Sequence, residues 1–142
     1  MNKFEIIRLH EGERLMPYVD TVGKLSIGVG RNLADKGIRK DEMELMLAND
    51  LREAESELLR IFPWAAGLDP VRFYVLEDMV FNMGAPKVQG FVNTMRMVRN
   101  GEYEKASVAM LQSKWATQVG NRARRLSKMM RTGQWPKDPS DF

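Results

Sequence analysis

Two carboxylic acids and a hydroxyl lie close together near the start of the chain, at Glu11, Asp20 and Ser26. Two carboxyl groups that flank a glycosidic bond can hydrolyse it: one protonates the departing oxygen, and the other activates a water on the opposite face. A neighbouring hydroxyl can help to hold that water. In such an inverting site the carboxyl groups lie roughly 6.5–9.5 Å apart. Because the chain has 19 Asp and Glu residues, the spacing alone also fits ordinary solvated carboxylates.

The composition removes several other chemistries. The chain has 142 residues and no cysteine, and His10 is its single histidine. Disulfides, thiolate nucleophiles and zinc–thiolate sites are therefore excluded, and a triad or metal centre would need ligands from residues other than His10. We expect no metal and no cofactor. With 44% hydrophobic and 29% charged residues, the composition is typical of a globular domain.

Apolar runs are no longer than four or five residues, far short of the roughly 20 that cross a membrane. The first residues carry positive charge but no apolar stretch of signal-peptide length. We therefore expect no membrane insertion and synthesis in the cytoplasm. A target outside the membrane would be reached only after a separate event opens that membrane.

Charge is unevenly distributed along the chain. Residues 1–95 hold 12 Lys and Arg against 15 Asp and Glu, whereas residues 96–142 hold 10 against 4. A basic surface on one part of a small protein favours a polyanionic partner, such as nucleic acid or an anionic cell-wall polymer. Charge alone does not choose between them.

Glycines and apolar periodicity predict the elements of the first half. Residues 2–11 are expected to form a helix that ends at Gly12. From Arg14 to Leu33, glycines separate short alternating segments, a pattern typical of a small antiparallel sheet. A turn then leads to an apolar stripe from Lys40 to Ile61, which predicts one long amphipathic helix.

The second half is expected to be helical. Asp69 followed by Pro70 is a favourable helix start, because aspartate caps the first turn and proline suits its first position. This helix should end at Gly84. The remaining predicted helices cover residues 92–100, 102–113 and 122–131, the last of them capped by Asn121.

These elements predict an α+β fold in which a small antiparallel β-sheet lobe is joined by a long helix to a mainly α-helical lobe. We expect a single domain over residues 1–142. The sheet lobe would cover about residues 12–40 and the connecting helix about residues 40–61. Residues 1–11 and 62–142 would form the helical lobe.

The candidate acids belong to a longer pattern, EG-x-RL-x-x-Y-x-D-x-x-G-x-x-S-I-G-x-G, from Glu11 to Gly30. It resembles the active-site segment of the phage-type lysozymes, or endolysins, which are family-24 glycoside hydrolases. The similarity continues in family order through LDPVRFYVLEDMVFNMG, GFVNTMRMVRNGEYEKA, SKW, NRARR and RTGQW. The resemblance covers most of the chain and implies a lysozyme-like fold, with a shorter segment between Leu33 and Lys40.

The resemblance implies a muramidase that hydrolyses the β-1,4 bond between N-acetylmuramic acid and N-acetylglucosamine in bacterial peptidoglycan, lysing cells without metal or cofactor. Glu11 matches the family's essential acid. Asp20 matches the carboxylate that positions water or steadies positive charge on the sugar. Ser26 takes the place of a threonine whose hydroxyl orients that water; without the threonine methyl, the hydroxyl is less restricted.

Further positions are matched residue by residue. Asn32, Phe81 and Thr94 fall where the family contacts the saccharide. Arg122 matches an arginine that approaches the acid from the helical lobe, although an ion pair without catalytic effect accounts for it equally well.

Arg31 departs from the family, because it replaces a histidine that pairs with an aspartate on the long helix. Counting along that helix puts the aspartate at Asp50. We therefore expect an Arg31–Asp50 ion pair.

Three alternatives remain open. A lytic transglycosylase would cleave the same bond with one acid and form an anhydro sugar, but the retained Asp20 and Ser26 argue against it. A nucleic-acid-binding domain could use the basic segment NRARRLSKMMR, yet it leaves the Glu11–Gly30 pattern unexplained. An inactive wall-binding relative is disfavoured by the intact acids. We expect peptidoglycan as the partner, no nucleic acid, and a monomer.

Overall fold

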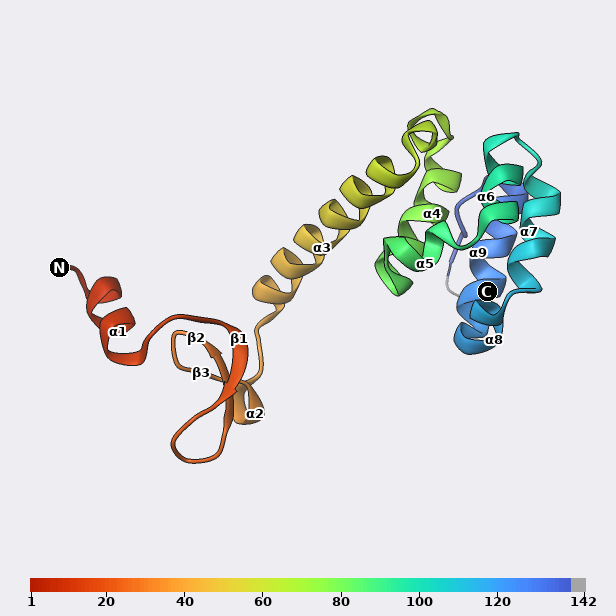
Figure 1. Ribbon diagram of the computed structural model, residues 1–142. Coiled ribbons are helices and arrows are strands. Elements are labelled where there is room, and N and C mark those ends of the chain that lie inside the picture. Colours follow the sequence, from red (N-terminus) through yellow and green to blue (C-terminus); the bar gives the residue numbers. More distant parts are fainter. Residues whose placement is uncertain (139–142) are drawn as a thin grey trace. The chain divides into compact units, whose positions relative to one another are not determined.

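The computed structural model describes residues 1–138 (Figure 1). The chain divides into two compact units, Met1–Leu47 and Ala48–Phe142. The boundary falls inside the long helix α3 (Lys40–Ile61), so the first turns of that helix belong to the first unit. The predicted grouping of residues 1–11 with the helical lobe stays a prediction.

The first unit opens with helix α1 (Lys3–Glu11). The Asn2 side chain accepts hydrogen bonds from the backbone N–H groups of Phe4 and Glu5, while the Glu5 carboxylate accepts from the N–H of Asn2. This reciprocal cap fixes the start of the helix. Gly12 ends it with φ of 78°, a conformation that a residue with a Cβ rarely adopts. The predicted helix is therefore confirmed.

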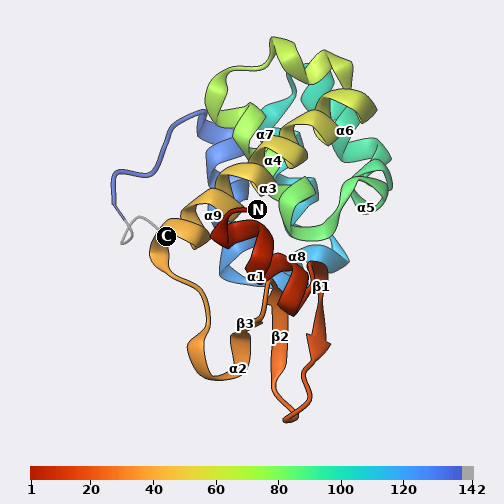
Figure 2. The same ribbon diagram turned by 90° about the vertical axis from the view of Figure 1, so that its left-hand side faces the viewer.

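A three-stranded antiparallel sheet follows, in the order β1 (Arg14–Val19), β2 (Leu25–Gly28) and β3 (Arg31–Asn32). Figure 2 shows β2 between its two neighbours. Arg14 pairs with Gly28 and Tyr18 with Ser26, and the register shifts between these two pairs. The small antiparallel sheet expected from the glycine spacing is confirmed.

Helix α2 (Leu33–Lys36) occupies the segment where we expected a turn. Its single turn forms because the Asn32 side chain caps the N–H of Asp35 and Gly37 closes the other end. Helix α3 matches its predicted bounds. Its apolar stripe is buried at Ala54 and Leu58 but exposed in the first turns.

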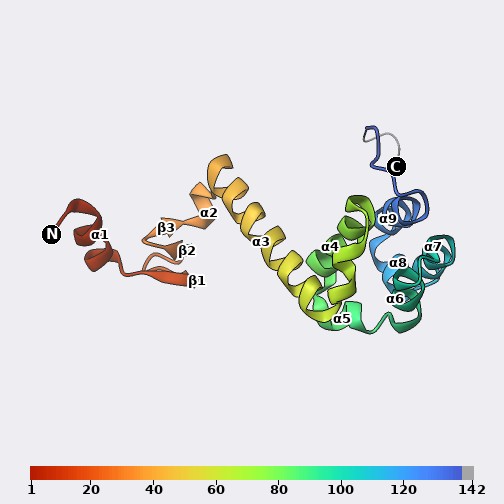
Figure 3. The ribbon, with the colours of Figure 1, turned by 90° about the horizontal axis from the view of Figure 1, so that it is seen from above.

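The second unit is a cluster of short helices (Figure 3). Helix α9 lies against α4, α7 and α8, and α6 lies against α7. Their apolar faces enclose a methionine-rich core in which Met79, Met110 and Met130 are fully buried. Along the chain the elements are η1 (Pro63–Gly67), α4 (Pro70–Met83), α5 (Ala85–Gln89), α6 (Val92–Arg99), α7 (Tyr103–Leu111), α8 (Lys114–Val119) and α9 (Asn121–Thr132).

The helix that begins at Asp69-Pro70 is confirmed, with the Asp69 side chain accepting from the N–H of Arg72. Two short helices, α5 and α8, were missed. Ser113, expected at the end of a helix, instead caps the start of α8 by accepting from the N–H of Ala116. The expectation that Asn121 caps α9 was wrong, because the helix already begins at that residue. Within residues 1–138, no helix is both long and apolar enough to span a membrane.

Candidate active site

Glu11 is the last residue of α1, and local pairing places it beside the β2–β3 turn. Gly12 reverses the chain after the helix, and β1 begins at Arg14, which pairs with Gly28. The exposed Glu11 side chain consequently lies against Gly30 in that turn. The position that a Cβ would occupy on Gly30 is 2.9 Å from Glu11 Oε2 and 3.1 Å from its Cδ.

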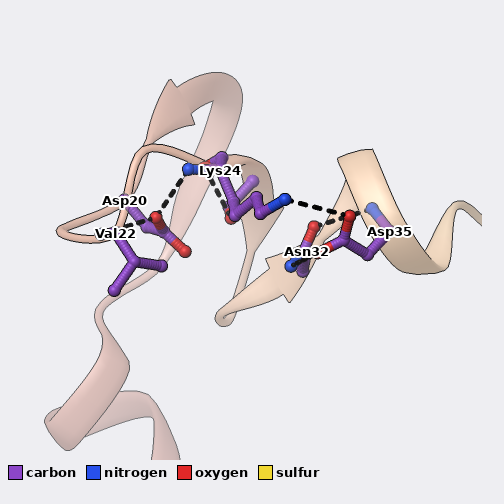
Figure 4. Close-up of polar contacts among 6 residues, drawn as sticks. Asp20, Val22, Lys24, Asn32 and Asp35 are labelled. Carbon is purple, nitrogen blue, oxygen red and sulfur yellow. Dashed lines mark hydrogen bonds and ion pairs between the residues drawn. The ribbon is translucent and has the colours of Figure 1, made fainter.

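Asp20 lies in the turn between β1 and β2, where the backbone fixes its carboxylate (Figure 4). Oδ1 accepts hydrogen bonds from the N–H of Val22 at 3.0 Å and from the N–H of Lys24 at 2.8 Å. The main chain closes the same turn through a bond from Asp20 N–H to the Lys24 carbonyl at 2.9 Å. Neither side-chain bond uses Oδ2, so that oxygen is the one that could serve a water.

Ser26 is brought to Asp20 through one residue, Lys24. The Ser26 hydroxyl donates to the Lys24 carbonyl at 3.2 Å, while the Lys24 N–H donates to Asp20. Ser26 is only 2% exposed, inside the strand next to β1. The hydroxyl oxygen retains acceptor capacity, but its proton is directed at the backbone. The role of Ser26 in orienting water stays a prediction.

Asn32 uses its side chain within the first unit. Its Oδ1 accepts from the N–H of Asp35 at 3.0 Å, and its Nδ2 donates to Asp35 Oδ2 at 3.1 Å. Asp35 also accepts from Lys24 Nζ at 3.3 Å, so the turn that holds Asp20 and the cap of α2 are linked (Figure 4). A sugar contact by the Asn32 amide would have to compete with these bonds, and that predicted contact stays a prediction.

Arg31 forms a bidentate ion pair with Glu42 in the first turn of α3. Nη1 and Nη2 each lie 2.8 Å from one Glu42 oxygen, and Nη1 also donates to the Gly37 carbonyl at 3.2 Å. Arg31 thus binds Glu42 within the first unit, and the Arg31–Asp50 pair stays a prediction. Gly37 ends α2 and leads directly into α3, so the start of that helix meets β3. Asp50 follows Glu42 by about two helical turns.

This pair makes stability depend on pH. Hydrogen bonds from Arg31 and from the backbone N–H of Arg39 lower the pKa of Glu42 from 4.5 to about 2. A carboxyl with a lowered folded pKa stabilises the fold fully above its unfolded pKa, and the contribution is lost as pH falls through the folded value. We expect Glu42→Gln to flatten the loss of unfolding free energy between about pH 4.5 and 2. Urea titrations at several pH values measure this, and Glu44→Gln, at an exposed position of the same helix, should keep the parental slope.

The second unit carries the other predicted residues. Phe81 is 42% exposed at the end of α4. With Asp50 it lines a hollow of about 410 Å³ that also includes Glu53 and Glu57. Thr94 is only 6% exposed in α6 and offers little surface to a sugar. The predicted sugar contacts of Phe81 and Thr94 stay predictions.

Arg122 is engaged within the second unit. Its Nε lies 2.8 Å from Asp78 Oδ1, and the Tyr74 hydroxyl donates to Asp78 Oδ2 at 2.8 Å. Burial, aided by this hydrogen bond, raises the pKa of Tyr74 to about 12. Asp78 and Tyr74 were not among the residues predicted from the sequence. The two residues are four apart on one helix, and residues with this spacing share a face. That spacing could have predicted their hydrogen bond.

A glutamate that ends a helix beside an antiparallel sheet, together with a backbone-held aspartate and a serine on that sheet, is the arrangement expected of a lysozyme-like glycoside hydrolase. A model of the phage lysozyme family matches residues 8–131. That range includes every predicted site residue. The chain belongs to the phage lysozyme family and is a glycoside hydrolase of the lysozyme type.

Curated proteins show the same relationship. "Probable T4-type lysozyme 2" of Dictyostelium discoideum is 26% identical over 159 residues, covering 91% of this chain and 93% of the relative. "Probable T4-type lysozyme 1" of the same organism is 26% identical over 161 residues, with the same coverage. The "Pre-baseplate central spike protein Gp5" of Enterobacteria phage T4 is also 26% identical over 161 residues, which cover 94% of this chain but 28% of that protein.

Proposed function

We propose that this protein is an inverting muramidase that hydrolyses the β-1,4 bond between N-acetylmuramic acid and N-acetylglucosamine in peptidoglycan. Glu11 protonates the oxygen that leaves N-acetylmuramic acid as its bond to C1 breaks. A water bonds to C1 from the opposite face and gives its proton to Asp20. The product then carries the α configuration at the new reducing end.

The observation that carries this proposal is the link between Asp20 and Ser26 through the backbone of Lys24. Two N–H groups hold Asp20 Oδ1, so the carboxylate keeps one orientation without using Oδ2. A carboxylate that the backbone holds in one orientation suits the handling of water. A lytic transglycosylase does not need such a pair, because the sugar's own hydroxyl attacks C1.

Product analysis tests the proposal. Peptidoglycan digested in H₂¹⁸O should give muropeptides that each gain one ¹⁸O at the new reducing end, and NMR at early times should show the α anomer. Anhydro-muropeptides without ¹⁸O would establish the transglycosylase instead. A β anomer at early times would exclude inversion while leaving hydrolysis intact.

The same proposal includes a role as an endolysin, made in the cytoplasm and acting on the wall once the membrane is opened. Bacteria that express the protein should remain turbid until chloroform is added and should then clear. Cells that express Glu11→Gln, treated in the same way, provide the control for membrane damage alone. Clearing before chloroform would contradict the need for a separate membrane-opening event.

We expect the basic helix α9 to contribute to substrate capture. Its exposed cations include Arg124, Lys128 and Arg131, and the walls of bacteria carry anionic peptides and polymers. Salt shortens the reach of such attraction to about 10 Å at 0.1 M. Raising salt should therefore increase KM for whole walls several-fold while hardly changing KM for short neutral oligosaccharides. Equal effects on both substrates would count against capture by charge.

A further inference from the structure

We propose that Gly30 is a positioning residue for the reaction, because its missing side chain leaves the space that the Glu11 carboxyl occupies. This inference rests on the proposed role of Glu11 as the acid. This role of Gly30 is separate from its ability to adopt the positive φ of the turn.

The space is defined by three distances. A Cβ on Gly30 would lie 2.9 Å from Glu11 Oε2, 3.1 Å from Cδ and 3.3 Å from Cγ. Non-bonded carbon atoms in proteins attract best at about 3.5–4.0 Å. A methyl group at residue 30 and the Glu11 carboxyl therefore cannot both keep these places.

The carboxyl is the group that would move. The turn that contains Gly30 is held on both sides, by the Ser26–Asn32 and Ile27–Arg31 pairs and by the ion pair of Arg31 with Glu42. Glu11, by contrast, is exposed, and its side chain extends from the end of α1. Rotation about its side-chain bonds relieves the clash without disturbing the sheet. A substitution at Gly30 should consequently displace the acid rather than unfold the unit.

Gly28, the last residue of β2, provides a control two residues from Gly30. Its φ is 70° and that of Gly30 is 68°, so a side chain at either position meets similar backbone strain. A Cβ on Gly28, however, would meet no described atom within 4 Å. The two glycines thus differ mainly in whether a methyl group reaches Glu11.

The experiment compares Gly30→Ala with Gly28→Ala in the full chain. Both should lose similar amounts of stability in urea. Gly30→Ala should lower kcat on peptidoglycan fragments at least tenfold with little change in KM, whereas Gly28→Ala should keep kcat within about twofold of the parent. The carboxyl ¹³C resonance of Glu11, measured at one pH, should move in Gly30→Ala and stay in place in Gly28→Ala. A purely structural role of Gly30 would not separate the variants in this way.

Equal kcat values and equal Glu11 resonances in the two variants would overturn the inference. If either alanine variant fails to fold, Gly30→Asn and Gly28→Asn repeat the comparison, since asparagine tolerates positive φ better than alanine. Glu11→Gln separates this inference from the proposed function. An inactive Glu11→Gln with equal glycine variants overturns only the role of Gly30, whereas an active Glu11→Gln overturns the acid assignment and the Gly30 inference with it.

Discussion

Replacing Glu11 with glutamine is expected to lower peptidoglycan clearing by about 10³-fold or more while the protein folds normally. General acid catalysis contributes typically 10²–10⁴-fold, and an amide has no proton to deliver to a leaving oxygen. Glutamine has nearly the same shape as glutamate, and the Glu11 side chain is exposed, so the core does not depend on it. Clearing rates measure the loss, and circular dichroism with a thermal melt verifies the fold.

Glu13→Gln is the matched control for this change. Glu13 is a second exposed glutamate two residues along the chain, and it forms a surface ion pair with Arg8 at 3.0 Å. Such a pair contributes little to stability. The control should therefore keep nearly full activity and stability. A Glu11→Gln protein that retains more than about a tenth of parental activity would falsify the assignment of Glu11 as the acid.

The parts of the fold that could be predicted are those encoded by neighbouring residues. Gly12 ends α1, Asp69 and Pro70 start α4, and the apolar stripe of α3 gives its full length. Each signal acts within one or two turns of the chain. The missed helices α5 and α8 are too short to show an apolar periodicity. Ser113, which we expected to end a helix, is instead the N-cap of α8.

The site was predictable in its residue types but not in its contacts. Glu11, Asp20 and Ser26 were found from chemistry and resemblance, whereas the approach of Glu11 to Gly30 depends on the pairing of β1 with β2. The ion-pair partner of Arg31 depends on where α3 starts relative to β3. Counting residues along the helix does not reveal that position. Contacts between segments distant in sequence are set by folding as a whole, and no local pattern records them.

Arg72 makes contacts of this kind between distant segments. Among the partly exposed charged residues of the second unit, we expect its substitution to lower the free energy of unfolding the most. It lies in α4 with its side chain 16% exposed. Nε donates to the Met130 carbonyl at 2.7 Å and Nη2 to the Arg131 carbonyl at 3.1 Å, at the C-terminal end of α9. The guanidinium also lies 3.7 Å from the centroid of the Tyr103 ring.

These contacts give Arg72 two tasks, since it satisfies carbonyls that the last turn of a helix leaves unpaired and places positive charge at the negative end of the helix dipole. Hydrogen bonds from a charged group contribute about 1.5–3 kcal/mol each, and a cation over a ring about 0.5–2 kcal/mol, without full additivity. We expect Arg72→Met to lower the unfolding free energy by about 2–4 kcal/mol. Arg72→Lys should recover only part of this, because an ammonium lacks the planar fork that reaches both carbonyls.

Urea unfolding of Arg72→Met, of two comparison variants and of one double variant tests whether the Arg72 guanidinium holds α4 against the end of α9. Arg60→Met is the control, because that arginine is 67% exposed and lies 4.0 Å from Glu57, and its removal should cost less than about 1 kcal/mol. Gly133→Ala approaches the same contact from the other side: a Cβ there would lie 2.7 Å from Arg72 Nη1, and positive φ adds strain. When Arg72 is also replaced by Met, the clash with the Arg72 side chain is absent. Gly133→Ala should then lower the unfolding free energy only through the backbone strain of its positive φ. Two results would contradict this role of Arg72. One is that Arg72→Met lowers the unfolding free energy no more than Arg60→Met; the other is that Gly133→Ala lowers it equally in both backgrounds. Water would then satisfy the two carbonyls, and the hydrogen bonds from Arg72 would not hold α4 against α9.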